Sequence, residues 1–112
     1  MLPRSQRLNL KKDFKWVAQG KKIETKYLKL FSRLGINLHP RIGIAVSSKT
    51  FSKSTDRNRA RRLTSQAFQS TYNVLPTNIN IVALPKQGVL DVKSSEVLED
   101  LEGVLKDEIY HH

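Results

Sequence analysis

Positive charge is concentrated in the first half of this 112-residue chain. Residues 1–62 contain 17 lysines and arginines and three acidic residues, whereas residues 63–112 contain three lysines and seven acidic residues. A chain of this length has room for one domain with one core, so both halves must pack together. The fold therefore has to keep a segment with a net charge of +14 at its surface, and this bias indicates a polyanionic partner. The alternative is a basic surface that only aids solubility.

The sequence lacks the motifs that mark enzymes and membrane proteins. There is no cysteine, which excludes disulfides, thiolate metal sites and a cysteine nucleophile, and fits a cytoplasmic location. No apolar stretch approaches the ~18 residues that cross a bilayer, so we expect no membrane association. There is no HExxH motif, phosphate-binding loop or GxSxG motif, and His39, His111 and His112 do not form a ligand set. We therefore expect no catalytic residue, no metal site and no cofactor bound by the protein, and assign no role to the last two histidines.

Hydrophobic periodicity predicts three helices and three strands in a single domain, residues 1–112. The expected helices cover residues 10–18, about residues 57–72, and the stretch that begins at Ser94 or Ser95. The expected strands cover residues 27–34, 41–49 and 78–84. The apolar stripe of the last helix consists of Leu98, Leu101, Leu105 and Ile109.

The first two strands are separated by a short turn segment, residues 35–40, so we expect them to pair as a hairpin. Alternation predicts that Leu28, Leu30 and Leu34 point inward from the first of these strands. It predicts the same for Ile42, Ile44 and Val46 of the second. Strands and helices are mixed without regular alternation, which favours an α+β fold. We expect a single-domain α-β sandwich with helices packed on a small mixed sheet.

The segment DRNRARRL, residues 56–63, carries the strongest functional signal. On a helix, Ala60, Leu63 and Ala67 fall on one side, and Ser54, Thr55 or Asp56 is placed to cap the first turn. Arginines near a helix N-terminus repel one another and oppose the macrodipole, a cost that bound phosphate would offset. An ordinary solvated face is the alternative. The opposite side of the helix is predicted to carry Asn58, Arg61, Arg62, Ser65 and Gln69.

A second basic group is interleaved with aromatic residues near the first helix and the first strand. Rings that stack bases and cations that hold the backbone are the combination used to bind single-stranded nucleic acid. For Phe14 and Tyr27, core packing is an equal alternative. Trp16 lies about 200° from Phe14 on the helix, away from the apolar stripe, so we expect it to be at least partly exposed. The group contains Lys11, Lys12, Lys15, Lys21, Lys22 and Lys26, with Phe14, Trp16, Tyr27 and Phe31 among them.

Four segments match a set of known patterns in the same order. DRNRARRLTSQAF (residues 56–68) is similar to RNRxKRxxREAFR, and RIGIAVSSK (residues 41–49) is similar to RxGxSVSKK. INIVALP (residues 79–85) takes the place of DIVVIARP. Asp13, Phe14, Val17, Gly20 and Lys21 are similar to the pattern DFxxVxxxGK, with two residues instead of three between the valine and the glycine. Over nearly its whole length the chain therefore resembles the bacterial ribonuclease P protein subunit, the RNR-motif family.

This resemblance implies a ribosomal protein S5 domain 2-like α-β sandwich, in which a left-handed βαβ crossover presents the arginine-rich helix. It implies a non-catalytic protein component of a ribonucleoprotein endoribonuclease, whose catalytic RNA uses Mg²⁺ to remove the 5′ leader of precursor tRNA. The implied partners are that RNA and the leader. Carried over by position, the residues that face the catalytic RNA are Lys49, Arg57, Asn58, Arg59, Arg61 and Arg62. Those implied to bind the leader are Phe14, Lys15, Tyr27 and Phe31, to which charge and exposure add Lys11, Lys12 and Trp16.

The chain departs from the family pattern at several positions. Ser65, Gln66 and Gln69 stand where Arg, Glu and Arg are common, so the cationic helix face is shorter. Trp16 offers a substitute stacking surface for an aromatic ring missing at position 18. The remaining departures are Ser48 for a lysine, Leu84 for an arginine and Ala18 for a phenylalanine.

Two other functions compete with the one that the resemblance implies. A ribosomal or ribosome-assembly RNA-binding protein is the main alternative, since small basic sandwiches also dock on structured RNA. A protein-only nuclease is disfavoured because the acid-base and metal-ligand residues are missing. In each RNA-binding case the basic segment repels itself when no RNA is present. We therefore expect small anions such as sulfate or pyrophosphate to bind and stabilise the RNA-free protein.

Overall fold

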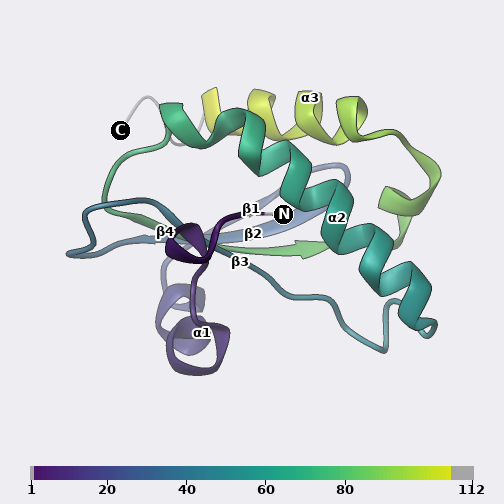
Figure 1. Ribbon diagram of the computed structural model, residues 1–112, viewed down its shortest axis with the longest axis horizontal. Coiled ribbons are helices and arrows are strands. Elements are labelled where there is room, and N and C mark those ends of the chain that lie inside the picture. Colours follow the sequence, from purple (N-terminus) through teal and green to yellow (C-terminus); the bar gives the residue numbers. More distant parts are fainter. Residues whose placement is uncertain (1, 107–112) are drawn as a thin grey trace.

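The computed structural model describes residues 2–106 and shows a four-stranded sheet with helices on both faces (Figure 1). Ile109, His111 and His112 lie outside the described residues. The α-helices are α1 (Leu10–Ala18), α2 (Ser54–Thr71) and α3 (Ser94–Val104). The strands are β1 (Lys21–Glu24), β2 (Leu28–Leu34), β3 (Arg41–Ile44) and β4 (Ile79–Pro85). Short 3₁₀ turns are η1 (Arg4–Gln6), η2 (Tyr72–Val74) and η3 (Gln87–Asp91).

The strand order is β1-β2-β4-β3, with β4 paired antiparallel to β2 and parallel to β3. The predicted hairpin between residues 27–34 and 41–49 is therefore wrong. Every residue of β4 except Leu84 is buried, and a strand that is apolar on both faces belongs in the interior of a sheet. The hairpin that does form joins β1 to β2. The sequence did not reveal β1, because KKIE is short and mostly charged.

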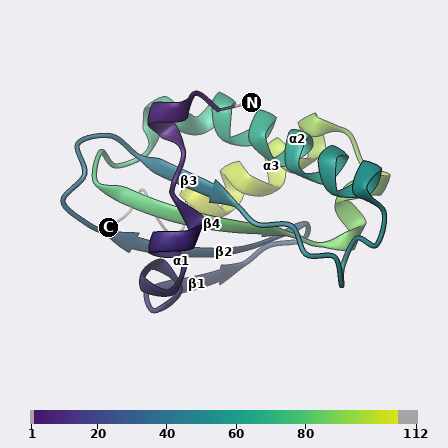
Figure 2. The same ribbon diagram turned by 60° about the horizontal axis from the view of Figure 1, so that its bottom comes forward.

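The two faces of the sheet carry different layers: α2 and α3 cover one face and α1 lies on the other (Figures 1 and 2). Alternate residues of β4 supply both layers. Ile81 and Ala83 belong to the main core with α2 and α3, whereas Val82 packs with Val17 of α1 in a smaller cluster. The predicted buried side of α2 is confirmed, since Ala60, Leu63 and Ala67 all lie in the main core. The α+β sandwich is thus confirmed; the handedness of the β3-α2-β4 crossover remains a prediction.

β3 is shorter than predicted and ends at Ile44. One further hydrogen bond, from the Ala45 amide to the Ala83 carbonyl (2.9 Å), continues the pairing before the chain leaves the sheet. Ile44 and Val46 still pack against the main core, as expected. Leu34 does not: its side chain is 59% exposed, because β2 ends there and the chain turns away from the sheet.

The helix boundaries differ from prediction mainly at the start of α2. This helix begins at Ser54, and its N-cap is Lys53, which makes no side-chain capping bond. The expected caps Ser54, Thr55 and Asp56 therefore lie within the first turn. By contrast, Asn9 caps α1 by accepting a hydrogen bond from the Lys12 amide (3.3 Å).

The N-terminal segment is held at the outer edge of β3 by a close approach at Gly43. A Cβ atom there would lie 2.5 Å from Cδ2 of Leu10, so a larger residue would push α1 away from the strand. Next to this contact, Arg7 forms an isolated parallel bridge with Ile42, and the Leu8 amide donates to the Ile42 carbonyl (3.0 Å). Residues 2–8 therefore cover part of an edge that would otherwise be open.

Asp100 of α3 ties the helix layer to the β1–β2 turn. Its carboxylate accepts hydrogen bonds from the Thr25 hydroxyl, the Lys26 amide (3.1 Å) and the Tyr27 amide (2.9 Å). The Thr25 oxygen in turn accepts from the Leu28 amide (2.9 Å). Charge-assisted hydrogen bonds of this kind are about twice as strong as neutral ones. This single carboxylate therefore fixes the turn that joins β1 to β2.

We expect Asp100→Ala to lower the free energy of unfolding by about 2 kcal/mol, because it removes the shared acceptor of three donors. Urea denaturation measures the change. Glu99→Ala is the matched control, since Glu99 is the exposed neighbour on the same helix and its loss should cost less than about 0.5 kcal/mol. Equal effects of the two substitutions would show that the turn does not depend on Asp100.

Candidate nucleic-acid interface

The exposed arginines of α2 form the first candidate surface. Arg59 and Arg62 are exposed and Arg61 is half-buried. Arg61 donates to the side-chain oxygen of Asn58 (3.1 Å), which orients this guanidinium along the helix. Within residues 2–106, no carboxylate forms an ion pair with any arginine of this helix. Their charges are therefore available to an external anion.

Arg57 behaves differently from the other arginines of the motif. Its Nη1 donates to the carbonyls of Phe51 (2.8 Å) and Ser52 (3.2 Å), and its side chain is partly buried. The guanidinium thus folds back on the loop that precedes α2. Lys49 lies in this loop, beyond the end of β3 rather than in the strand where the sequence placed it, and it is exposed.

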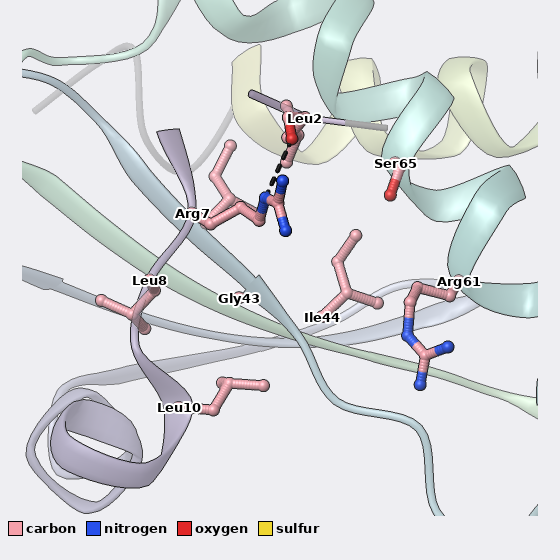
Figure 3. Close-up of a pocket in the computed structure, with 9 residues that line it drawn as sticks. Leu2, Arg7, Leu8, Leu10, Gly43, Ile44, Arg61 and Ser65 are labelled. Carbon is pink, nitrogen blue, oxygen red and sulfur yellow. Dashed lines mark hydrogen bonds between the residues drawn. The ribbon is translucent and has the colours of Figure 1, made fainter. Parts of the chain in front are cut away.

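Ser65 does not lie on the exposed cationic side of α2, contrary to prediction. Its side chain is only 3% exposed. The reason is the N-terminal segment: Leu2 is buried in the main core and lines the same pocket as Ser65 (Figure 3). Helical periodicity alone does not reveal this contact, because residues 2–8 carry no periodic pattern of their own.

The second candidate surface is the sheet face that α1 covers only in part. Phe14 of α1 and Phe31 of β2 each pack against the smaller cluster and remain partly exposed. Lys29 places its ammonium 5.6 Å from the centroid of the Phe31 ring, within cation-π range. Tyr27 is not part of this group, because it packs against the main core on the other side. The lysines on the exposed side of α1 are Lys11, Lys12 and Lys15.

Trp16 is 37% exposed, which confirms the prediction of partial exposure. The guanidinium carbon of Arg33 lies 4.6 Å from the centroid of its ring, and Arg33 Nη1 donates to the carbonyl of Trp16 (3.1 Å) and to Oε1 of Gln19 (3.2 Å). Arg33 therefore covers part of the indole. The alternation of rings and cations along residues 27–33 predicts that Lys29 and Arg33 share a face with Phe31, and both cations lie against aromatic rings of this surface.

Two kinds of feature are absent from the described residues: a cluster of metal-ligating side chains and a helix able to span a membrane. No group of three or more His, Cys, Asp or Glu side chains within residues 2–106 is arranged to hold a metal ion. In the same part of the chain, none of the helices has the length and apolar character needed to span a membrane. The side chains at the two candidate surfaces are mainly cations and aromatic rings.

Comparison with known proteins agrees with this chemistry. The family model for ribonuclease P matches residues 2–108. The ribonuclease P protein components of Sodalis glossinidius and Yersinia pestis are 34% and 35% identical over 101 residues, covering 89% of this chain and 84% of each relative. The RNase P protein from Thermotoga maritima superposes with a TM-score of 0.79 at 30% identity, covering 89% of this chain and 97% of that one. The chain therefore belongs to the ribonuclease P protein family, the protein components of a ribonucleoprotein endoribonuclease that processes tRNA.

Proposed function

We propose that the protein binds the catalytic RNA of ribonuclease P through α2 and the loop before it, and the 5′ leader of precursor tRNA on the α1 face of the sheet. The observation that supports this best is the row of guanidinium groups on α2 that have no carboxylate partner within residues 2–106. One guanidinium group can donate two parallel hydrogen bonds to the oxygens of a phosphate. Each such contact also releases counterions from the RNA. Arg59, Arg61, Arg62 and Lys49 make these contacts.

The second candidate surface is the one that we propose binds the leader. An unpaired strand exposes base faces and phosphates, and Phe14, Phe31 and Trp16 offer ring surface beside lysines and Arg33. Tyr27 contributes less than the resemblance implied, since its ring packs against the main core. The cations that hold the backbone of the leader are Lys11, Lys12, Lys15, Lys29 and Arg33.

The contribution of the protein to cleavage is then electrostatic and positional. Two polyanions must approach each other, and a basic protein between them reduces their repulsion and holds the leader extended. Hydrolysis belongs to the RNA and its Mg²⁺, so no protein side chain acts on the scissile bond. The protein lowers the Mg²⁺ concentration that the RNA requires, and it works in the cytoplasm, where the RNA partners are.

A reconstituted cleavage assay tests the proposal. Protein, bacterial ribonuclease P RNA and precursor tRNA are combined at low Mg²⁺, and cleavage should require both protein and RNA. Arg59→Glu and Arg62→Glu should each raise the protein concentration needed for half-maximal cleavage roughly tenfold, because a lost charge-assisted contact is worth about 1.5 kcal/mol or more. Lys106→Glu makes the same charge change just beyond the C-terminal end of α3 and should have little effect.

Three results would contradict the proposal. Cleavage by the protein without RNA would indicate a nuclease. Absence of any stimulation would favour a ribosomal or ribosome-assembly role. An effect of Lys106→Glu as large as that of Arg59→Glu would mean that net charge alone, rather than the α2 surface, controls binding.

Arg57 should affect stability more than RNA binding. We expect Arg57→Ala to lower the free energy of unfolding by about 1–2 kcal/mol, since it frees the Phe51 and Ser52 carbonyls and loosens the loop before α2. Arg59→Ala should change it by less than about 0.5 kcal/mol, because Arg59 is exposed. Urea titrations of both variants measure the difference. Identical stabilities would show that the carbonyl contacts do not hold the loop.

Small anions should stabilise the RNA-free protein. At ten times its Kd, pyrophosphate should add about 1.4 kcal/mol to the stability and raise Tm by roughly 5 °C or more, because it binds the cationic surfaces of the folded state only. Differential scanning calorimetry with sodium chloride of equal ionic strength as the control measures this. If both salts give the same Tm, the anion effect is general screening and no anion site is formed.

A further inference from the structure

We infer that a pocket at the outer edge of β3 takes one unpaired nucleotide of the partner RNA, its base against the apolar floor and its flanking phosphates on Arg7 and Arg61. The pocket has a volume of about 360 Å³ and lies where the N-terminal segment, β3 and α2 meet (Figure 3). This volume falls within the usual range for small-molecule sites. The inference rests on the proposed RNA binding and adds to it a specific site and ligand.

The floor of the pocket is apolar and its ends are cationic. In Figure 3, Ile44 lies between the guanidinium groups of Arg7 and Arg61, which come from different elements. No acidic residue lines the pocket. The apolar part of the lining consists of Leu2, Leu8, Leu10, Ile42, Gly43 and Ile44.

Both guanidinium groups are oriented by the protein itself. Arg7 donates from Nε to the carbonyl of Leu2 (3.0 Å), and Arg61 donates from Nη1 to Asn58 (3.1 Å). Each group keeps further N–H donors for a ligand. Side chains held in this way lose less entropy on binding than free surface arginines do.

The backbone of β3 offers hydrogen bonds at the same place. In a strand, the amide and the carbonyl of one residue point to the same edge and those of the next residue point to the opposite edge. The Ala45 amide bonds to β4. The Ile44 amide and carbonyl therefore point to the outer edge. Within residues 2–106, the bridge to the N-terminal segment involves Ile42 only. The amide and carbonyl of Ile44 can therefore form hydrogen bonds with a ligand.

These features together match a nucleotide rather than a simple anion. A base has two flat apolar faces and a polar edge, and an RNA strand places a phosphate on each side of it. The pocket presents apolar walls, a free peptide edge and a cation at each end. Arg61 also belongs to the α2 surface that we propose binds RNA, so the pocket is continuous with that interface.

The small side chain of residue 65 helps to keep the pocket open. Ser65 lines the pocket, at a position where the motif RNRxKRxxREAFR has arginine. An arginine there would extend into the space that the small hydroxyl leaves open. Ser65→Arg therefore separates two explanations: it should strengthen binding that depends on charge alone and block binding that depends on the pocket.

NMR of the full-length protein labelled at isoleucine and leucine methyl groups tests the inference with adenosine 5′-monophosphate as the probe. Millimolar nucleotide should shift the Ile44 and Leu8 methyl signals, and ribose 5-phosphate should not, since it lacks the base. Decanoate, an apolar anion without a base, should bind more weakly. Equal shifts with ribose 5-phosphate, tighter binding of decanoate, or no shift with any probe would overturn the inference.

Substitutions of single residues test whether the nucleotide binds in this pocket. Ser65→Arg should abolish the methyl shifts, and Arg7→Gln should raise the Kd for the nucleotide about fivefold. Arg4→Gln is the matched control: Arg4 is exposed on the same segment but does not line the pocket, so its Kd should stay unchanged. Stronger binding by Ser65→Arg would overturn the inference, and so would equal Kd values for the Arg7 and Arg4 variants. The Arg7 variant keeps the test decisive if Ser65→Arg fails to fold.

The cleavage assay separates this inference from the proposed function. If the wild-type protein stimulates cleavage while the nucleotide shifts no pocket methyl, the pocket is wrong and the proposed function stands. If the nucleotide binds in the pocket but the protein gives no stimulation, the proposed function fails instead.

Discussion

The burial of β4 on both faces is the constraint on which the rest of the structure depends. Its side chains alternate between the main core under α2 and α3 and the smaller cluster under α1, so one strand holds both layers together. A strand of this kind needs a partner on each edge, and it takes β2 on one and β3 on the other. Because β3 runs parallel to β4, the chain between them must cross over the sheet, and this crossover contains α2. The position of the arginines thus follows from the pairing of apolar strands far from them.

The electrostatics of the molecule follow from the same arrangement. The acidic α3 packs beside α2 on one face, yet its carboxylates do not neutralise the α2 arginines within residues 2–106. Asp100 instead binds backbone amides and the Thr25 hydroxyl at the β1–β2 turn. Repulsion among the unpaired cations therefore remains in the folded protein and lowers its stability. RNA bound as we propose would relieve this repulsion, so folding and RNA binding would favour each other.

The sequence predicts those features of the structure that depend on residues close together in the chain. The periodic segments gave α1, the buried side of α2 and the start of α3, because helical spacing is set by neighbours in the chain. The partners of β3 and β4 could not be read, since strand pairing depends on which strand needs burial on both faces. The roles of Arg57 and Ser65 were missed for a related reason. One is fixed by carbonyls of a loop and the other by the N-terminal segment, and neither contact has a periodic signature.

The shorter cationic face of α2 has a structural counterpart in the N-terminal segment. Where arginine is common at position 65, this chain has a serine, and Arg7 supplies a guanidinium at the same pocket from another element. The pocket therefore has a guanidinium at the edge of β3, while serine at position 65 leaves open the space that a longer side chain would occupy. Attraction to phosphate depends on distance and not on which element carries the cation, so Arg7 contributes to it as an arginine on the helix would. The shape of the surface depends more strongly on residue 65, because a long side chain there would cover the apolar floor of the pocket. Serine at position 65 should therefore change which ligand fits the surface more than how strongly the surface attracts phosphate.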